Sequence, residues 1–314
     1  MRRLQDIDLK SLRVFRAIVE AGGLAGAQAV LNSSQSTLST QLADLEKRLG
    51  FRLCRRGRGG FALTQQGQRL LEALEDYLAA ADHFQNAAAS ILGEMRGVLR
   101  LGVMDALLSN TAWDLPGILG DFHARARNTV IELSLLSPLE MERQLREGRR
   151  DLVIGPFFRQ ISGLRHVPLF QERHALYCAT GHPLAGQDSV PSGALGQHPF
   201  VARGYLHRYD VARVGHVEPA ALVDMMEPQA VLIRSGRFIG YLPCHYAEAI
   251  GGLSRIRTAT PTDYLSPIHL VHVAGADENI LIRSFLNRLA EYPLRLPAQD
   301  GRDFIEPFPG EKYI

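Results

Sequence analysis

The 314 residues are too many for one typical domain, so we expect two or three domains. The net charge of +2 hides an asymmetry: residues 1–70 hold 12 Lys and Arg against 5 Asp and Glu, a charge of +7, whereas the remaining residues hold 23 against 28, a charge of −5. A basic head on an acidic body is typical of a nucleic-acid-binding segment joined to another domain and argues against a purely metabolite-binding protein.

The apolar segments and the cysteines indicate in which compartment the protein works and whether it binds a metal or cofactor. No stretch reaches the ~18 apolar residues that a membrane span needs, and the N-terminus lacks an apolar core of signal-peptide length. We therefore expect a cytoplasmic protein that binds no membrane. Cys54, Cys178 and Cys244 are scattered without the spacing of metal ligands or of a disulfide framework. We expect no metal site and no cofactor.

The first elements that the sequence predicts are three helices. Residues 8–21 and 24–31 have the apolar spacing of two helices, and Gly22-Gly23 separates them. A third helix follows Ser34, a suitable N-cap, and ends at Gly50, which favours the left-handed conformation of a helix end. Its buried stripe consists of four leucines at helical spacing: Leu38, Leu42, Leu45 and Leu49.

The outer face of this third helix carries short hydroxyl and amide side chains. A helix, a tight turn and a second helix make the DNA-binding helix-turn-helix, in which the second helix enters the major groove. Short polar side chains on that helix can contact base edges. The candidate base-reading residues are Gln35, Ser36, Thr37, Ser39, Thr40 and Gln41. Taken alone, these residues also fit a helical hairpin packed into a larger core.

A basic hairpin is predicted over residues 51–63, as a strand, a Gly-rich turn and a second strand. Arginines around a flexible turn suit contact with phosphates or with the minor groove, and we assign Arg55, Arg56 and Arg58 to that role. The alternative is a hairpin whose charges are simply solvated.

A long helix is predicted from Thr64, which can cap it, to about Leu92. At ~1.5 Å per residue it would be over ~40 Å long. Its apolar stripe consists of Leu70, Leu71, Leu74, Tyr77, Leu78, Ala81, Phe84, Ala88 and Ile91. Such a stripe without a neighbour in sequence usually pairs with a second copy, and we assign Leu71, Leu74 and Leu78 to that dimer face.

Strands and helices alternate beyond a predicted hinge at 93–97, which is typical of parallel α/β packing. The predicted strands lie at 98–104, 130–136, 151–154, 165–178, 199–203, 238–242 and 268–273, with helices at about 110–126, 138–147 and 278–289. The last strand and helix are expected to return to the first of two lobes. The segment 293–314 is expected to form a surface extension.

Residues 8–92 resemble the N-terminal winged helix-turn-helix and linker helix of LysR-type transcriptional regulators. The matching positions are Asp8 to Phe15, Ser34-Gln35, Leu38-Ser39, Leu45-Glu46, Leu49-Gly50, Leu53, Arg56 and Leu63 to Gly67. The chain departs from the family at Ser36 and Thr40, where Pro and often Arg are usual. It also departs at Gln28 and Ser33, which would place two polar side chains where the helices pack.

The resemblance implies an α/β protein overall, with an all-α winged helix-turn-helix, a linker and dimerisation helix, and a two-lobed effector domain like periplasmic binding proteins. These parts would span 1–63, 64–93 and 94–314, with lobe 1 at about 97–163 and 267–292 and lobe 2 at about 164–266. The implied function is transcription regulation through double-stranded operator or promoter DNA. A small-molecule effector, a homodimer, a homotetramer and contact with RNA polymerase are implied as well.

Ligands of open α/β sheets bind beyond the carboxyl ends of strands, against helix N-termini. This rule selects Asp105, Ser109, Ser137, Pro156 and Phe157 in one lobe and Arg203, Tyr205, Glu218 and Tyr241 in the other. Relatives often hold an anion with Ser or Thr about where Asp105 falls. Asp105 would repel an anion and can instead cap the helix, whereas Arg203 supplies a positive centre. For each residue a structural role is the open alternative.

Two further observations bear on this cleft. The family's Gly-x-Gly stands here as Gly236-Arg237-Phe238, which predicts a narrower or partly filled pocket. The histidines are scattered, and no HExxH, GxSxG, Walker or GxGxxG motif is present, so we expect no catalytic residue. An enzyme or a metabolite-binding module built on the two lobes is the alternative to the regulator.

Overall fold

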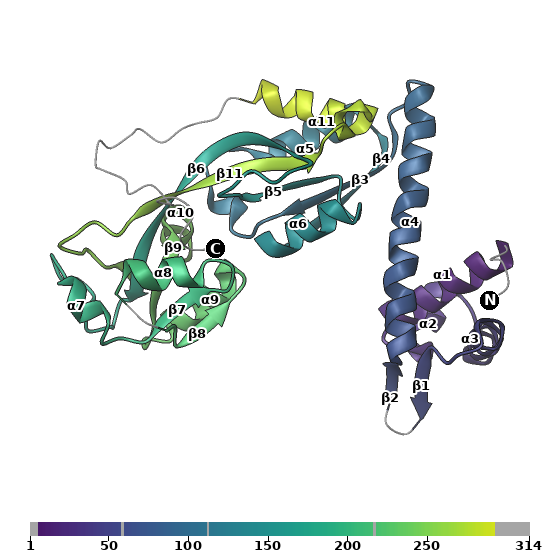
Figure 1. The fold of residues 1–314 in the computed structure, drawn as a ribbon, viewed down its shortest axis with the longest axis horizontal. Helices are drawn as coiled ribbons and strands as arrows, with labels where there is room; N and C mark the ends of the chain where they lie inside the picture. The colour runs from purple at the N-terminus through teal and green to yellow at the C-terminus, as the bar shows by residue number, and fades with distance from the viewer. Residues whose placement is uncertain (1–5, 58–59, 112, 216–217, 293–314) are drawn as a thin grey trace. The chain divides into compact units, whose positions relative to one another are not determined.

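The computed structural model describes residues 6–57, 60–111, 113–215 and 218–292 (Figure 1). They pack as two compact units that divide after Ala81, within the long helix α4 (Gln65–Ile91). Arg58 and the extension predicted over 293–314 lie outside the described residues.

The N-terminal unit is a winged helix-turn-helix. It contains α1 (Asp6–Glu20), α2 (Leu24–Leu31), α3 (Gln35–Leu49), β1 (Cys54–Gly57) and β2 (Gly60–Leu63). The two strands pair as an antiparallel hairpin. Its core includes Phe15, Ile18, Ala27, Leu38, Leu42 and Leu45, all buried. These elements confirm the three helices and the hairpin that the sequence predicts.

The beginning and the end of α3 follow its sequence. The Ser34 side chain accepts the backbone N–H of Thr37 at 3.2 Å, which satisfies one orphan donor of the first turn. Gly50 adopts a left-handed φ of 83° and ends the helix. Gln28 and Ser33 do not lie between the packed helices: their side chains are partly exposed and bond the carbonyl oxygens of Ala25 and Leu31. The expected polar contact between helices is therefore wrong, because both side chains bond their own segment.

Glu46 fixes the hairpin to α3. Its Oε1 accepts the backbone N–H groups of Leu53 at 2.8 Å and Cys54 at 3.2 Å. Cys54 is buried in the core of this unit. The start of the hairpin is therefore held by the same helix whose outer face carries the candidate base-reading residues.

No single described helix is long and apolar enough to cross a membrane. Asp8–Glu20 and Leu24–Leu31 pass the length and composition test only as a pair bent by 118°. Phe15, Ile18 and Ala27 of that pair form part of the core just described.

Helix α4 carries two apolar faces instead of one. Thr64 caps it as predicted, because its Oγ1 accepts the Gly67 N–H at 2.9 Å. Leu74 is only 4% exposed, and Leu71 and Leu78 pack with it against the winged-helix core. The assignment of Leu74 to a dimer face is therefore wrong, since its own domain already covers it, whereas Leu71 and Leu78 are only partly covered.

The second apolar face of α4 is exposed. Tyr77, Phe84 and Ile91 follow one another at intervals of seven residues and expose 46%, 75% and 86% of their surface. A repeat of seven places these side chains along one narrow strip of a helix.

The end of α4 is tied to the next strand, β3 (Arg96–Val103). The buried side chain of Asn86 donates to the Val98 carbonyl at 2.8 Å and accepts the Val98 N–H at 3.3 Å. Gly97 has a φ of +126°, and a Cβ atom there would lie 1.9 Å from Asn86 Oδ1. The predicted hinge at 93–97 is therefore held by side-chain hydrogen bonds at its C-terminal end.

Nine strands of the described C-terminal unit form one continuous sheet in the order β4-β3-β5-β11-β6-β9-β7-β8, with β10 beside β6. After β3, the strands are β4 (Asn128–Leu135), β5 (Leu152–Pro156), β6 (Leu164–Ala179), β7 (Phe200–Arg203), β8 (Ala221–Val223), β9 (Ile239–Pro243), β10 (Leu253–Arg255) and β11 (Tyr264–Val273). The strands predicted from the sequence are all present, and β8 and β10 are additional.

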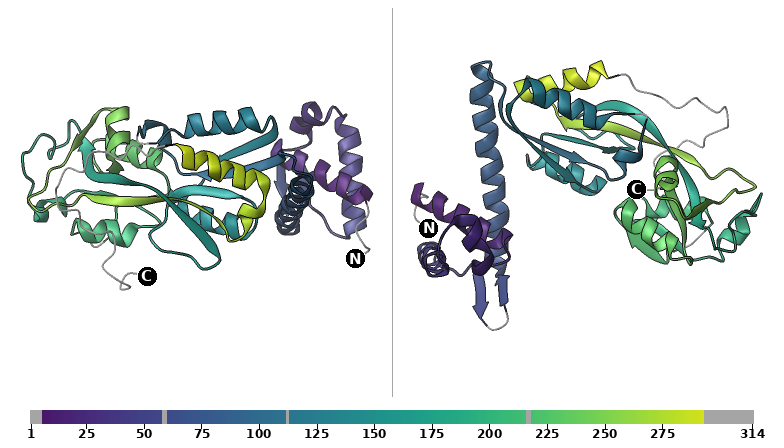
Figure 2. Two further views of the ribbon diagram at one scale, coloured as in Figure 1. Left: turned by 90° about the horizontal axis from the view of Figure 1, so that it is seen from above. Right: turned by 180° about the vertical axis from the view of Figure 1, so that it is seen from behind.

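Helices surround this sheet. They are α5 (Leu115–Arg125), α6 (Pro138–Arg146), α7 (Ser192–Leu195), α8 (His207–Arg213), α9 (Met226–Arg234), α10 (Cys244–Ile250) and α11 (Ile280–Glu291), with short 3-10 turns η1 (Leu107–Ser109) and η2 (Ala276–Glu278). In lobe 1, α5 and α11 lie side by side on one face of the sheet and α6 on the other (Figures 1 and 2). The predicted helix at 110–126 begins only at Leu115, because Asp114 caps it.

The prediction of parallel packing holds only for three strands of each lobe, because β5 pairs antiparallel with β11 and β9 pairs antiparallel with β6. β3 pairs parallel with β4 and β5, and β7 pairs parallel with β8 and β9. The long strands β6 and β11 run antiparallel to each other, from Tyr264 opposite His174 to Val273 opposite Leu164. They are the two connections between the lobes, and the chain passes in opposite directions along them (Figure 1). After the second crossing, α11 packs Phe285 against Phe122 of α5, which confirms the predicted return to lobe 1.

Candidate DNA-binding face and ligand cleft

The outer face of α3 presents the predicted polar residues. Gln35, Ser36, Thr37 and Thr40 are exposed, and Ser39 and Gln41 are partly exposed. The hydroxyls of Ser36 and Thr37 lie 2.8 Å from Ser34 Oγ, and Thr40 Oγ1 donates to the Ser36 carbonyl at 3.0 Å. The hydroxyl groups are thus bonded locally, whereas the amide of Gln35 stands in the exposed first turn. An amide can bond adenine at two atoms at once.

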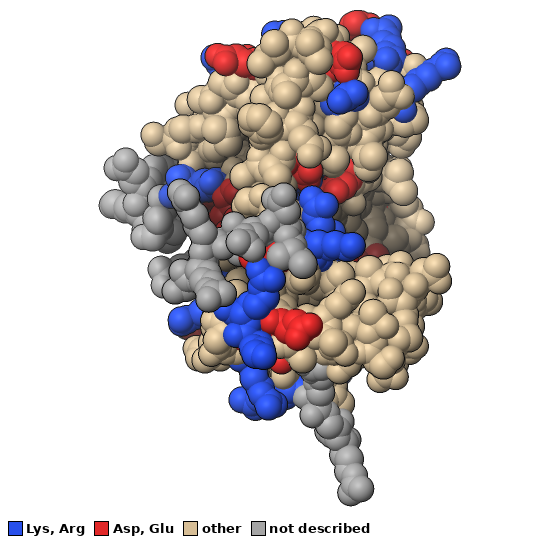
Figure 3. All heavy atoms as spheres, turned by 90° about the vertical axis from the view of Figure 1, so that its right-hand side faces the viewer, with Lys and Arg blue, Asp and Glu red and all other residues tan. Residues whose placement is uncertain are grey.

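Basic side chains accompany this face. Lys47, Arg48, Arg52 and Arg55 are exposed, and Arg48 forms an ion pair with Asp8 at 2.7 Å. Figure 3 shows a run of Lys and Arg side chains with acidic groups beside it. Of the three arginines predicted for the hairpin, Arg55 and Arg56 lie in β1, and Arg58 lies outside the described residues.

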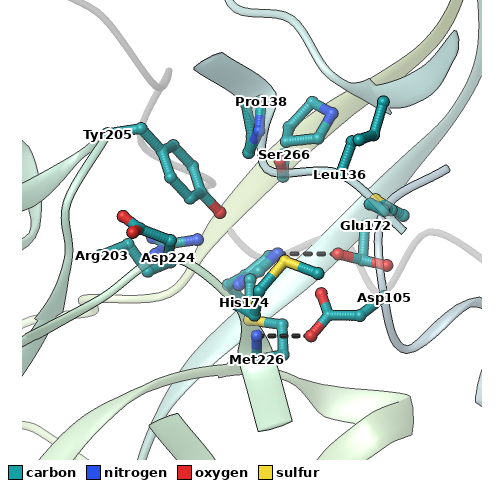
Figure 4. Close-up of a pocket in the computed structure, with 13 residues that line it drawn as sticks. Asp105, Leu136, Pro138, Glu172, His174, Arg203, Tyr205, Asp224, Met226 and Ser266 are labelled. Atoms are coloured by element: carbon teal, nitrogen blue, oxygen red, sulfur yellow. Dashed lines mark hydrogen bonds and ion pairs between the residues drawn. The ribbon is translucent and has the colours of Figure 1, made fainter. Parts of the chain in front are cut away.

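A narrow cleft lies in the C-terminal unit where the two lobes meet (Figure 4). Four of the predicted residues line it: Asp105, Pro156, Arg203 and Tyr205. The free volume is about 10 Å³, which is about the space of one water molecule. In this structure the lobes are therefore closed on each other.

Asp105 joins the lobes at this cleft. It follows β3 in lobe 1, and its Oδ2 accepts the backbone N–H groups of Met226 at 2.6 Å and Glu227 at 3.2 Å, the first residues of α9 in lobe 2. Burial raises the pKa of the Asp105 carboxyl, and the two N–H groups oppose this rise. The capping role considered for Asp105 is thus found, but on a helix of the opposite lobe.

A chain of four polar side chains forms a second link between the lobes. Ser109 of η1 lies 2.9 Å from His245 Nδ1 of α10, and His245 Nε2 lies 2.8 Å from Glu172 Oε1. Glu172 Oε2 lies 2.9 Å from His174 Nε2. Burial favours a raised pKa for Glu172, but the bonds from His174 and His245 outweigh it and lower the pKa to about 2. Glu172 is therefore ionised at neutral pH.

His174 is neutral in this chain. Burial lowers its pKa more than Glu172 raises it. A neutral ring that donates Nε2–H to Glu172 leaves its Nδ1 as an acceptor. His174 Nδ1 is buried and has no hydrogen-bond partner among the described residues. The ring stacks on Tyr264, with the centroids 4.9 Å apart.

Arg203 is not a free positive centre. The side chain is fully buried, and its Nε and Nη2 donate to the two carboxylate oxygens of Asp210 at 2.9 and 2.6 Å. It also donates to the hydroxyl of Tyr264. Burial alone would lower the pKa of Arg203, but Asp210 raises it well above the ordinary value. The expectation that Arg203 would attract an anion is corrected, because Asp210 already neutralises it.

The other predicted cleft residues have different positions. Ser137 caps α6 by accepting the Glu140 N–H at 3.4 Å, beside the lining residues Leu136 and Pro138. Phe157 is buried in the core of lobe 1, and Tyr241, also buried, donates to the Thr262 carbonyl in lobe 2. Glu218 and Phe238 do not line the cleft, and Phe238 packs against the lobe 2 core. The cleft is narrow because its lobes are closed, and not because of Phe238.

The sequence analysis missed three residues that line the cleft, Glu172, His174 and Asp224, and it missed His245, which bonds Glu172. Glu172 and His174 are two residues apart in the long strand predicted at 165–178, so their side chains lie on the same face. Two polar residues at that spacing in a buried strand indicate a polar site. Asp224 and His245 had no comparable signal, since their positions depend on how the chain returns to the cleft. Among the described residues, no group of three or more His, Cys, Asp or Glu is placed to hold a metal ion.

A winged helix-turn-helix, a long connecting helix and a two-lobed α/β domain with a cleft together define a DNA-binding regulator with a ligand-binding domain. Residues 9–68 match the family described as bacterial regulatory helix-turn-helix protein, lysR family, and residues 92–293 match the LysR substrate binding domain. The chain belongs to the LysR family of transcriptional regulators. The family resemblance is thereby confirmed, and the enzyme alternative is not supported, because the family and the relatives below are regulators.

Known relatives match this chain over most of its length. The HTH-type transcriptional activator BauR of Pseudomonas aeruginosa is 32% identical over 293 residues, which is 92% of this chain and 96% of BauR. The transcriptional regulator MetR of Salmonella typhimurium is 30% identical over 82% of each chain. The crystal structure of the LysR family regulator CbnR has a TM-score of 0.63 at 20% identity and covers 90% of this chain and 98% of CbnR. A structure of CbnR with its target DNA gives the same values.

Proposed function

We propose that this regulator recognises operator DNA with the exposed face of α3 and the β1–β2 hairpin. The observation that carries the proposal is the exposed, polar first turn of α3, held rigidly by the Ser34 cap and the buried leucine stripe. Gln35 and Thr40 are the base-reading residues that we consider decisive, with Ser36, Thr37, Ser39 and Gln41 on the same face. Arg55, Arg56 and Arg58 would supply contacts to phosphates or the minor groove.

We also infer that two copies pair through the exposed face of α4 and that the division into 1–63, 64–93 and 94–314 describes their roles. Tyr77, Phe84 and Ile91 support the pairing, because an exposed strip at heptad spacing matches a second copy of itself. A homodimer would place two reading helices on two half-sites.

A tetramer through the C-terminal units has separate support. Val130, Leu133 and Leu135 are exposed on the edge strand β4, and Leu222 is exposed on the opposite edge strand β8. Apolar edge strands are suited to pairing with other chains. Contact with RNA polymerase rests on the family alone, and a cytoplasmic location rests on the apolar pattern of the sequence.

The cleft is the proposed effector site. Residues of both lobes line it, so a bound molecule would contact both and change how they close. The two lobe-bridging links, from Asp105 to α9 and from Ser109 to His245, are the contacts that a ligand would have to alter. The regulator would then have two states of lobe closure, and binding of an effector could shift the population between them.

The salt dependence of DNA binding tests the hairpin. Genomic fragments that the protein retards in a gel should be bound with a strong salt dependence, and replacing Arg55 and Arg56 by Gln should reduce the slope by about one charge for each lost phosphate contact. The exposed Arg257→Gln in lobe 2 is the control and should leave the slope unchanged. An unchanged slope in the double variant would show that the hairpin does not contact the DNA.

A further inference from the structure

The place in the cleft that most readily holds an anion is already occupied by the protein. The first N–H groups of α9 carry the positive end of the helix dipole, and Asp105 Oδ2 bonds two of them. Arg203 is the only Lys or Arg on the described lining, and Asp210 binds its guanidinium at two points. An anionic ligand would therefore find both positive groups paired with carboxylates of the chain.

The remaining charged groups of the lining are acidic. Asp105, Glu172 and Asp224 all line the cleft, from a loop of lobe 1, from β6 and from the loop before α9 (Figure 4). Asp224 is exposed and has no hydrogen bond or ion pair among the described residues. The carboxylate of Asp224 is therefore available to a ligand without breaking a contact of the fold.

A buried acceptor without a partner supports the same conclusion independently. His174 is only 1% exposed and lines the cleft between Glu172 and Arg203 (Figure 4), and its Nδ1 bonds nothing in the described chain. An acceptor that is buried without a donor costs free energy, so it favours a ligand that brings an N–H group.

We propose that the cleft selects a small organic cation with N–H donors, such as a primary ammonium group, over an anion. The inference rests on the proposed effector role of the cleft and specifies its ligand. The ammonium group would bond Asp224, and one N–H would reach His174. Because the free volume is about 10 Å³, the lobes must part before the ligand enters, and the contact of Asp105 with α9 is expected to form again when they close on it.

Calorimetric titration of the full-length protein tests this selection. The probes are butylamine, which is cationic at pH 7.5, and propionate, an anion with the same number of heavy atoms. We expect butylammonium to bind at least tenfold more tightly than propionate. Asp224→Asn should weaken butylammonium binding by roughly tenfold or more, as loss of a hydrogen bond to a charged group predicts. Asp188→Asn, an exposed acid of lobe 2 outside the cleft, is the control and should bind like wild type.

Three results would overturn the inference. Propionate could bind more tightly than butylammonium, neither probe could bind at millimolar concentration, or Asp224→Asn could bind butylammonium as well as wild type. Gel shifts with genomic fragments on the same preparations separate this failure from failure of the proposed function. Intact DNA binding with no selection of cations refutes only the ligand class, whereas loss of DNA binding in the wild type refutes the regulator.

Discussion

Two carboxylates of the cleft, which could otherwise bind a ligand, bond groups of the protein itself and hold the lobes together. Asp105 gives its carboxylate to the N-terminus of α9, and Glu172 gives both oxygens to histidines. Glu172 is buried and Asp105 is partly buried, so each is favoured as an anion only while its N–H partners remain. The closed cleft and the ionisation of these two acids are therefore linked.

This linkage predicts an acid-sensitive C-terminal unit. Glu172 has an ordinary pKa of 4.5 and a native pKa of about 2, so its contribution to the free energy of unfolding is complete above about pH 4.5. The contribution is lost as the pH falls from 4.5 toward 2, because the unfolded chain then binds the proton first. Glu172→Gln removes the charge and should cost about 3 kcal/mol at pH 7, which is the free energy that a pKa lowered from 4.5 to about 2 represents.

Denaturant unfolding at a series of pH values measures this effect. The chain has a single tryptophan, Trp113, buried in lobe 1, and its fluorescence reports the C-terminal unit. The difference between wild type and Glu172→Gln should shrink between pH 4.5 and 2. A difference that is the same at every pH would show that the charge of Glu172 does not stabilise the fold.

The roles of single cleft residues could be predicted only where they follow from local sequence. A capping role for Asp105 was one alternative that the sequence left open, but the helix that it caps lies some 120 residues further along the chain. Arg203 looked like a free cation because Asp210, which neutralises it, is in the next helix with no charge pattern to mark the pairing. The role of a buried charged side chain depends on its partners in the tertiary structure, and these partners cannot be read from the sequence.

At the scale of elements, α4 shows why a broad apolar stripe is ambiguous. Sequence periodicity placed its leucines and aromatic residues on one side, but the structure separates a face buried in the winged helix from an exposed face. Leu74→Glu would therefore disrupt the N-terminal core instead of separating subunits. The helix itself was predictable from periodicity, whereas the partner of each face was not.

Phe84→Glu is the variant that tests pairing through α4. Phe84 is exposed in the single chain, so the variant should fold. A symmetric dimer would lose the burial of two Phe side chains at about 1.5–3 kcal/mol each, so the dissociation constant should rise by roughly 100-fold or more. Light scattering measures the mass, with the exposed neighbour Gln85→Glu as control. A folded Phe84→Glu protein that keeps the dimer mass would disprove this interface.

The joint between α4 and β3 makes a second prediction at this scale. Asn86→Ala would leave the Val98 N–H and C=O without their partner, at a cost of about 1–3 kcal/mol. Hydrogen exchange at the Val98 amide should become faster, and Gln85→Ala, on the exposed side of α4, should leave it unchanged. Equal protection of Val98 in both variants would mean that Asn86 does not hold this joint.

For the whole molecule, the order of strands and helices was predictable because each lobe repeats strand and helix at regular intervals. The antiparallel crossing of β6 and β11 was not, since strand direction depends on how often the chain passes between lobes. The helix-turn-helix was predictable in detail because cap, stripe and terminal glycine are all local signals. The closed state of the cleft depends on contacts between distant segments, and no local pattern encodes it.

Sequencing of the genomic fragments bound by wild type, Gln35→Ala and Gln85→Ala tests the central claim most directly, namely that α3 reads operator DNA. We predict that wild type and Gln85→Ala enrich the same site with two related half-sites. Gln35→Ala should lose preference at one position of each half-site, by roughly tenfold, since a base contact contributes about 1–3 kcal/mol of discrimination. Absence of any enriched sequence in the wild type, or an identical enriched site with Gln35→Ala, would contradict the account.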